Sequence, residues 1–420
     1  MGWWGISDTQ KLFKNIRNMP NIQNSEVIYF PKQVVEKAVQ QFETPFFLYE
    51  EKRMRENCRR FKSAFQKYFP NFWPLYAVKA NSNPEVLKII MSEGFDFDAS
   101  SAAEIWLTQK LGKSGMFTGN YTPASELKFA KDASYLLNLD DISMIPFLKE
   151  IGVPEFVSLR INPGVGNATI ESNVFAGPNA KYGIPHEQAA EAYKMAASMG
   201  VKKFGIHMMT GSNVPIQEKS YFGNIVRKLL EVVADVKGKT GIEIELLNMG
   251  GGFGVPYKPE EESLDIEEVA RSVREAFDEQ CAKYGLKEPR LIAEPGRWIA
   301  ANMGWLVGKV TVIKDSYKKF VGIDASSNDM PRPSIYGAYH HVSVVKKRNG
   351  SFEPNNKAKS LPGQTFDEGN LIEEGVGVIP PPVGGRGGNN STENASPEKL
   401  EVVSVVGTIC ENNDQLAKDR

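Results

Sequence analysis

The feature that most constrains this chain is a regular alternation of short apolar runs and helical patterns between residues 72 and 297. Strands that alternate with helices predict βαβ units and a parallel sheet. Eight such strands favour a closed barrel over an open sheet, so we expect an α/β fold of the (β/α)8 TIM-barrel type, with its chemistry at the C-terminal strand ends. The expected strands are residues 73–78, 95–99, 116–119, 135–139, 156–161, 204–209, 244–249 and 291–294.

A second, β-rich domain is expected after the barrel. The stretches LVGKVTVIKDSYKKFVGIDA and LEVVSVVGTIC predict strands without helices between them. We therefore divide the chain into an N-terminal extension (1–44), a barrel (45–305) and a C-terminal β domain (306–420). SEVIYF, residues 25–30, is expected to add a strand to the β domain. Residues 346–398, rich in Pro, Gly and Asn towards their end, predict a flexible insertion.

Composition excludes several classes of protein. The net charge is -1 and the chain has no long basic run, so we expect no nucleic-acid partner. No apolar stretch approaches about 20 residues, which predicts no membrane span. Three widely spaced cysteines predict a reducing, cytoplasmic location, although the basic first residues keep an organelle transit peptide as an alternative. We expect no metal site.

Lys79 ends the apolar run FWPLYAV, and NSNP after it predicts a turn before a helix over residues 85–93. The ammonium group is then placed at the C-terminal end of a strand, beside apolar neighbours. Burial there lowers the pKa of a lysine and frees its amine as a nucleophile. The alternative is a lysine whose stem lies on apolar surface while its charge reaches water.

Other expected strands are also followed by polar or glycine-rich motifs. NMGGGFGVPY holds Gly250, Gly251 and Gly252, whose backbone N–H groups can close on a phosphate; the alternative is a tight turn. AEPGR places Glu294 at the barrel mouth, with a structural ion pair to Arg297 as the alternative. Further strand ends carry side chains that could instead cap a helix or pack in the core, namely Asp98, His207 and Ser212.

A strand-end lysine, a late glycine-rich loop and a strand-end carboxylate together describe a site for pyridoxal 5′-phosphate. The lysine would hold the cofactor covalently and the glycines would hold its phosphate. The carboxylate would keep the pyridine nitrogen protonated, so that the ring can accept electrons.

The motifs YAVKAN, GGGFG, EPGR and CENND, in this order, resemble the fold type III, or alanine-racemase-like, pyridoxal-phosphate decarboxylases. MPRPSIYGAYHH, residues 330–341, resembles the branch that converts meso-2,6-diaminopimelate to L-lysine and CO2, the last step of lysine biosynthesis. The resemblance covers about residues 25–345 and 400–420. It implies a lyase that takes a small amino acid as its substrate.

The resemblance also implies a role for each matching residue. Three are expected to be catalytic: Lys79, which bonds to the cofactor, Glu294, which faces the pyridine nitrogen, and Cys410, which returns a proton to the α-carbon. Further cofactor contacts are expected from Asp98, His207, Ser212, Gly250, Gly251, Gly252 and Arg297. Arg297, Arg332 and Tyr336 are expected to bind the distal carboxylate of the substrate, and Glu411 its distal ammonium. In this family Cys410 and Glu411 come from the partner subunit, which implies a homodimer with shared active sites.

Two departures from the family pattern stand out. Met209 occupies the place where members often have a second histidine that stacks on the cofactor ring. The chain ends at LAKDR, residues 416–420, where members usually continue with strands that carry a tyrosine near the phosphate. A truncated chain with impaired dimerisation and activity therefore stays open as an alternative.

Two other functions also remain open: decarboxylation of another basic amino acid or polyamine precursor, and a non-catalytic paralogue of the same fold. Two arginines and a tyrosine suit a planar carboxylate, because guanidinium binds it in a bidentate fork. Ornithine has no distal carboxylate for such a group. The related ornithine and arginine decarboxylases typically have Asp where this chain has Glu411.

Overall fold

The computed structural model of the protein describes residues 31–165, 174–214, 220–258, 261–345 and 402–419. Eight parallel strands form a barrel, which is closed because β5 pairs with β6 as well as with β4. In barrel order the strands are β5 (Leu136–Leu139), β4 (Gly115–Phe117), β3 (Asp96–Ala99), β2 (Trp73–Ala77), β10 (Arg290–Ala293), β9 (Ile244–Asn248), β8 (Lys203–His207) and β6 (Phe156–Asn162). The predicted barrel and its eight strands are confirmed. A short strand, β7 (Ile184–Pro185), pairs with β6 beside them.

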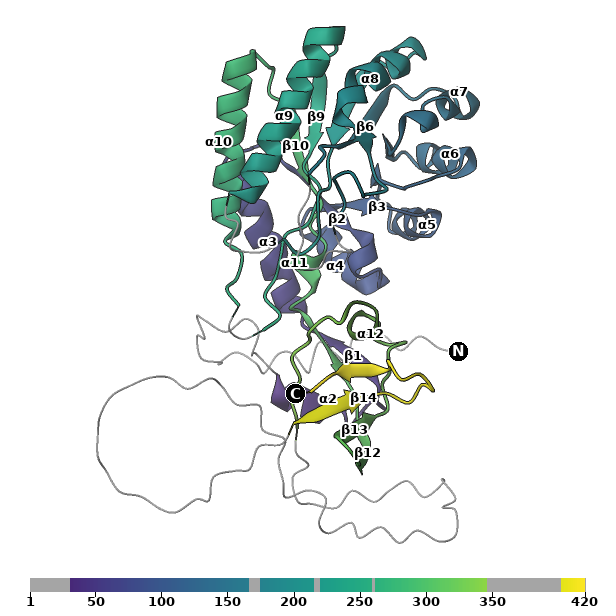
Figure 1. Ribbon diagram of the computed structural model, residues 1–420, viewed down its shortest axis with the longest axis vertical. Coiled ribbons are helices and arrows are strands. Elements are labelled where there is room, and N and C mark those ends of the chain that lie inside the picture. Colours follow the sequence, from purple (N-terminus) through teal and green to yellow (C-terminus); the bar gives the residue numbers. More distant parts are fainter. Residues whose placement is uncertain (1–30, 166–173, 215–219, 259–260, 346–401, 420) are drawn as a thin grey trace, which may run out of the picture.

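Helices surround the barrel strands, as Figure 1 shows. Local sequence explains their ends. Asn83 accepts a hydrogen bond from the Glu85 N–H of α4, and Asp265 caps α10 in the same way, which satisfies N–H groups that have no helical partner. Gly285 ends α10 in the left-handed conformation that glycine adopts without strain. The helices are α3 (Glu51–Gln66), α4 (Pro84–Ser92), α5 (Ala102–Lys110), α6 (Ala124–Asp132), α7 (Phe147–Ile151), α8 (Ala189–Ser198), α9 (Tyr221–Thr240), α10 (Ile266–Tyr284) and α11 (Arg297–Ala300).

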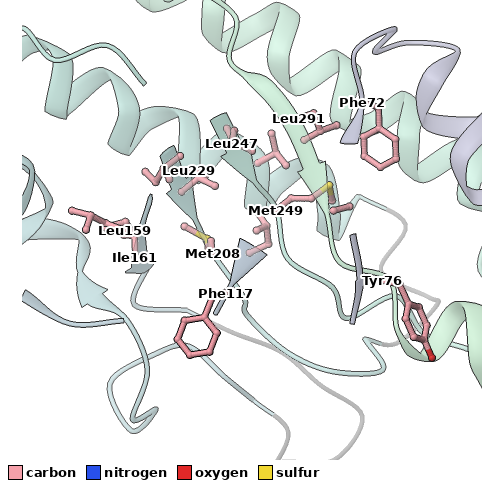
Figure 2. Packing of buried hydrophobic residues seen from close by; sticks show 14 of the residues in the cluster. Phe72, Tyr76, Phe117, Leu159, Ile161, Met208, Leu229, Leu247, Met249 and Leu291 are labelled. Carbon is pink, nitrogen blue, oxygen red and sulfur yellow. The ribbon is translucent and has the colours of Figure 1, made fainter. Parts of the chain in front are cut away.

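The barrel wall has two apolar faces, because alternate residues of a strand point to opposite sides. Leu75, Met116 and Ile292 form a small separate cluster of buried side chains, which we place inside the barrel. The neighbours of these residues in the strands, such as Tyr76 and Phe117, point to the other side and belong to the large core shared with the helices (Figure 2). This alternation decides which side chain of each strand reaches the barrel mouth.

A four-stranded sheet follows the barrel in sequence and lies below it in Figure 1. Its strands, in order, are β12 (Val310–Asp315), β13 (Lys319–Ile323), β14 (Val403–Val406) and β15 (Gln415–Ala417). The short helix α12 (Arg332–Tyr336) contacts β15. The predicted second, β-rich domain is therefore confirmed.

The N-terminal part joins the end of the barrel segment through a separate strand pair. β1 (Phe46–Tyr49) runs antiparallel to β11 (Gly304–Val307), and the helix α2 (Lys32–Ala38) precedes it. The strand predicted at residues 25–30 and the insertion predicted at 346–398 lie outside the described residues. The domain boundaries stay a prediction. Within the described ranges, no helix combines the length and the apolar character needed to cross a membrane.

The packing of α9 on α10 provides a test of the fold. A Cβ atom added to Gly223 would lie 2.8 Å from the Ser272 backbone oxygen of α10, closer than real Cβ contacts allow. We expect Gly223→Ala to destabilise the protein by about 1–3 kcal/mol, because the two helices must move apart. Urea unfolding followed by circular dichroism measures this change.

Gly238→Ala is the matched control, because it lies in the same helix and an added Cβ meets nothing within 4 Å. It should leave stability unchanged or raise it by up to about 1 kcal/mol. Equal unfolding midpoints for Gly223→Ala and wild type would contradict the close packing of the two helices.

Candidate active site

Lys79 lies in the short 3₁₀ turn Val78–Ala80 that follows β2. Its ammonium Nζ donates hydrogen bonds to Asp98 Oδ2 at 3.1 Å and to Ser100 Oγ at 3.2 Å. Asp98 is fully buried near the end of β3, and its other oxygen accepts a hydrogen bond from the Thr118 hydroxyl. The predicted placement of Lys79 at a strand end is confirmed, and its neighbours are polar.

The prediction of a lowered pKa for Lys79 is wrong. Burial alone would lower this pKa, but the carboxylates of Asp98 and Glu294 outweigh burial and raise it above its ordinary value. The side chain is also 56% exposed at the barrel mouth, so it is reachable from solvent. In the cofactor-free protein the amine is therefore an ion-paired ammonium group. It must lose a proton before it can act as a nucleophile.

Lys79 belongs to a ring of polar side chains at the C-terminal mouth of the barrel. Seven members come two residues after an inward-facing position of their strand, so the period-two alternation directs them to the barrel axis, and Lys79 joins them from the 3₁₀ turn after β2. We call these residues the mouth ring: Lys79, Asp98, Thr118, Asn138, Arg160, His207, Asn248 and Glu294. All except Lys79 are buried. Their polar atoms therefore need partners in the chain or in a bound molecule.

Glu294 follows β10 and carries the most perturbed carboxyl group of the mouth ring. Asn248 Nδ2 donates a hydrogen bond to its Oε1 at 2.6 Å. Burial, followed by the nearby charge of Asp98, raises the pKa of Glu294 to about 8, although Lys79, Asn248 and Arg160 each lower it. The alternative of a structural pair with Arg297 does not hold, because no contact within 4.0 Å joins these two described residues.

His207 ends β8 and lies opposite this carboxyl group. Asn138 Nδ2 lies 3.1 Å from His207 Nδ1; with the amide in this orientation it donates, which leaves the ring proton on Nε2. Nε2 is buried without a hydrogen-bond partner among the described residues, 3.7 Å from Glu294 Oε1. Burial, with the positive charges of Arg160 and Lys79, holds the pKa of His207 well below its ordinary value. The imidazole is therefore neutral.

The glycine-rich loop after β9 packs directly against the loop after β8. A Cβ atom on Gly250 would lie 2.6 Å from the Met208 carbonyl oxygen, and one on Gly252 would lie 2.5 Å from that of Gly211. Gly251 N donates to the thioether Sδ of Met209 at 3.2 Å. Only glycine permits this approach, so the two loops form one continuous wall of the mouth.

Two arginines meet at the edge of the same mouth. Arg297 donates one hydrogen bond to Ser212 Oγ at 3.1 Å and another to the Tyr257 hydroxyl. The guanidinium of Arg332, from α12, lies 4.7 Å from the centre of the Tyr257 ring. Arg332 Nη1 is 3.0 Å from His340 Nε2. We call Arg297, Arg332, Tyr257 and His340 the arginine cluster.

Three predicted site residues are exposed. Tyr336 lies one turn after Arg332 in α12, close enough to influence the pKa of that guanidinium, and 44% of it is exposed. Cys410 and Glu411 are exposed in the loop between β14 and β15. Among the described residues, no hydrogen bond or ion pair joins this loop to the mouth ring.

Asp414 fixes the loop that carries Cys410 and Glu411. Its buried carboxylate accepts hydrogen bonds from the backbone N–H groups of Ile409 at 2.8 Å and Ser327 at 2.6 Å. Asn413 also donates a hydrogen bond to the Ser334 carbonyl oxygen of α12. Cys410 is therefore exposed on a loop that these hydrogen bonds hold in place.

Residues 51–301 match the family described as pyridoxal-dependent decarboxylase, pyridoxal binding domain. A diaminopimelate decarboxylase of Methanothermobacter thermautotrophicus is 37% identical over 337 residues, 79% of this chain and 77% of the relative. The chain belongs to the pyridoxal-dependent decarboxylases. It is thus a pyridoxal-phosphate enzyme of the barrel type that the sequence predicted.

Two further comparisons agree with this membership. Protein TabA of Pseudomonas amygdali pv. tabaci is 32% identical over 314 residues, 74% of this chain and 72% of that protein. Among solved structures, the diaminopimelate decarboxylase from M. jannaschii in co-complex with L-lysine has a TM-score of 0.72 and 28% identity. That match covers 92% of this chain and 80% of the other.

The residues of this decarboxylase fit pyridoxal phosphate. Lys79 offers a reachable amine, and Glu294 offers a buried carboxyl group with no lysine or arginine within 4.0 Å in the described part of the chain. His207 Nε2 and Arg297 Nε are buried polar atoms without a partner among the described residues. The loop from Gly250 to Gly252 leaves backbone rather than side chains at the wall. These features supply an attachment point, a counter-charge and donors for an anionic cofactor.

Sequence reasoning missed several residues of this site. Arg160, in the mouth ring, lies 3.5 Å from Asp140, and its guanidinium lies 4.5 Å from the centre of the Tyr182 ring. The strand pattern could have predicted Arg160, because it stands two residues after an inward-facing position of its strand and therefore points to the barrel mouth. No strand pattern could have predicted Tyr257 and His340, since they lie in loops whose course depends on the folded chain.

The pKa of Glu294 predicts how the stability of the cofactor-free protein depends on pH. Between pH 4.5 and about 8 the folded protein retains the Glu294 proton while the unfolded chain releases it. The stability that Glu294 contributes is therefore fully present below the pKa that it has in the unfolded chain. This stability is lost as pH rises through the pKa that Glu294 has in the folded protein. Glu294→Gln keeps the oxygen that accepts from Asn248 and cannot ionise. Relative to wild type, it should gain stability on going from about pH 5 to about pH 8.

Urea unfolding at both pH values measures the difference between variant and wild type. Glu191→Gln, on an exposed position of α8, is the control and should show the same pH dependence as wild type. A Glu294→Gln curve parallel to that of wild type would show that Glu294 is already ionised in the folded protein.

Proposed function

We propose that this enzyme decarboxylates meso-2,6-diaminopimelate to L-lysine and CO2. The observation that carries the proposal is the arginine cluster, two guanidinium groups at the mouth of a pyridoxal-phosphate barrel without a described carboxylate within 4.0 Å. Such a cluster suits a substrate with a second carboxylate. The relative from M. thermautotrophicus, with 37% identity, supports the same substrate.

We assign the cofactor contacts to the mouth ring and the glycine-rich loop. When bound, pyridoxal phosphate supplies an electron-withdrawing ring that accepts the electron pair left by departing CO2. Lys79 would hold it covalently, and Asp98 keeps the Lys79 amine oriented. Glu294 would place a carboxylate at the ring nitrogen, where a positive charge would lower its raised pKa. Ser212 and the loop from Gly250 to Gly252 would donate to the phosphate.

The distal end of the substrate decides which bond breaks. Arg297, Arg332 and Tyr336 would hold the distal carboxylate, which fixes the direction of the whole molecule. Ornithine and other polyamine precursors lack that group and would leave both arginines without an anion. A decarboxylase of such amino acids is therefore the weaker candidate.

We further propose that the enzyme is a homodimer with shared active sites. Cys410 and Glu411 are displayed on an ordered, exposed loop, a placement that suits insertion into the mouth of a second copy. There the Cys410 thiol would return a proton to the α-carbon, and Glu411 would accept from the distal ammonium. The expected cytoplasmic location stays a prediction.

The first experiment asks whether the protein is this enzyme. Purified holoenzyme is expected to release CO2 from meso-2,6-diaminopimelate, and much more slowly from ornithine, arginine and lysine. After borohydride reduction, peptide mass spectrometry should find the cofactor on Lys79. Lys79→Ala should lose both the adduct and turnover, because no other mouth-ring residue carries an amine.

Lys128→Ala is the matched control, since Lys128 pairs with Asp132 on the surface of α6. It should keep both the adduct and turnover. An adduct on a different lysine would overturn the assignment of Lys79. An adduct on Lys79 without CO2 release from any amino acid would indicate a non-catalytic paralogue.

Mixing two inactive variants tests the shared site. Cys410→Ala removes the proposed proton donor from one copy, and Lys79→Ala removes the cofactor attachment from the other. After subunit exchange, the mixture should recover about a quarter of wild-type activity, because half of the dimers are mixed and each has one intact site. Activity assays on the mixture measure the recovery, and native mass spectrometry shows the exchange. An exchanged mixture without recovery would contradict a site built from two chains.

A further inference from the structure

The arginine cluster contains one histidine, His340, which contacts both Arg332 and Tyr257. His340 lies in the segment after α12, and its ring packs edge-on against Tyr257 with centroids 5.4 Å apart and an interplanar angle of 76°. Its Nε2 is 3.0 Å from Arg332 Nη1. A guanidinium only donates hydrogen bonds, so Nε2 must be the acceptor and the ring proton must be on Nδ1.

The charge of the cluster is positive and lacks a partner within the described part of the chain. No described carboxylate lies within 4.0 Å of Arg297 or Arg332, and both guanidinium groups contact the same Tyr257. Burial lowers the pKa of Arg332, and the neighbouring charge of Arg297 lowers it further. Two like charges stay together here because uncharged groups hold them.

His340 is suited to hold Arg332 without cancelling its charge. Burial, followed by the charges of Arg332 and Arg297, lowers the pKa of His340 to about 4, so the ring is neutral near neutral pH. A carboxylate at this position would also accept from Arg332, but it would neutralise the guanidinium and compete with an anionic ligand. A neutral acceptor orients the guanidinium fork and leaves its remaining N–H groups for a carboxylate.

We propose that His340 is a positioning residue that selects a second carboxylate: by accepting a hydrogen bond from Arg332 and packing on Tyr257, it aims an uncompensated guanidinium at the distal end of the substrate. This inference rests on the proposed function, because it assigns the distal end to the arginine cluster. It adds a specificity determinant that acts through Arg332.

Three substitutions separate positioning from packing. His340→Phe keeps an aromatic ring against Tyr257 and removes the acceptor. His340→Gln places an amide oxygen near the position of Nε2 and keeps the acceptor. His340→Glu keeps an acceptor and adds the negative charge. Arg332→Ala serves as the reference for complete loss of the guanidinium.

The first measurement needs no turnover. Calorimetry on the holoenzyme measures the affinity for pimelate, a seven-carbon dicarboxylate without amines, and for heptanoate, which has a single carboxylate. His340→Phe should weaken pimelate binding by about tenfold or more, as expected for a lost hydrogen bond to a charged group. His340→Gln should stay close to wild type, and His340→Glu should lose as much as Arg332→Ala. Heptanoate can place its single carboxylate on the same guanidinium, so its affinity should fall in the same order among the variants.

The second measurement is the steady-state kinetics with meso-2,6-diaminopimelate. His340→Phe should raise KM far more than it lowers kcat, and His340→Gln should restore KM. Melting temperature and the absorbance of bound cofactor should match wild type in both variants. Unchanged pimelate affinity in His340→Phe, or equal losses in His340→Phe and His340→Gln, would overturn the role of His340.

The outcome for His340 is distinct from the outcome for the proposed function. If wild type releases no CO2 from meso-2,6-diaminopimelate, or if Arg332→Ala binds pimelate as wild type does, the substrate assignment fails. If wild type releases CO2 from meso-2,6-diaminopimelate and Arg332→Ala loses affinity for pimelate, but the His340 variants behave as wild type, the substrate assignment stands and the positioning role is overturned.

Discussion

The buried carboxyl group of Glu294 beside a second buried carboxylate, Asp98, is the constraint on which the rest of the site depends. Two such groups cannot both carry their charge inside a barrel unless cations lie close to them. Lys79 and Arg160 are those cations, and after burial itself they are the charges that keep His207 neutral. Even so, the pKa of Glu294 stays raised to about 8, so the chain does not fully compensate its charged form. A cationic ring nitrogen, as proposed for the bound cofactor, would stabilise that charged form.

The arginine cluster differs from the mouth ring because its two positive charges are held by uncharged groups. At the mouth ring, opposite charges are paired in the chain itself, as Lys79 is with Asp98. At the cluster, Arg297 and Arg332 are held by hydroxyl, ring and imidazole groups, which orient a guanidinium and leave its charge in place. A site that binds an anion only part of the time needs such support, because an internal carboxylate would occupy it permanently.

The sequence predicted what depends on local pattern. Periodicity located the eight strands, and the strand ends located Lys79 and Glu294. It misjudged what depends on neighbours across the barrel: the pKa of Lys79 rises because Asp98 comes from the adjacent strand, and Glu294 binds Asn248 rather than Arg297. Residues such as His340 could not be predicted, because their partners are set by how a segment beyond the barrel folds back over the mouth.

Met209 shows how a departure from the family pattern can be absorbed locally. Its thioether accepts the Gly251 N–H, and its Sδ would lie 3.0 Å from a Cβ atom on Gly250. The Met209 side chain is therefore packed against the glycine-rich loop, and it is only partly buried. Methionine is polarizable and packs well against aromatic rings, although it cannot stack or donate a proton as an imidazole can. The substitution thus keeps the contact between the two loops that form the wall of the site. Any hydrogen bond or charge that a histidine would supply at position 209 must come from other residues, such as those of the mouth ring.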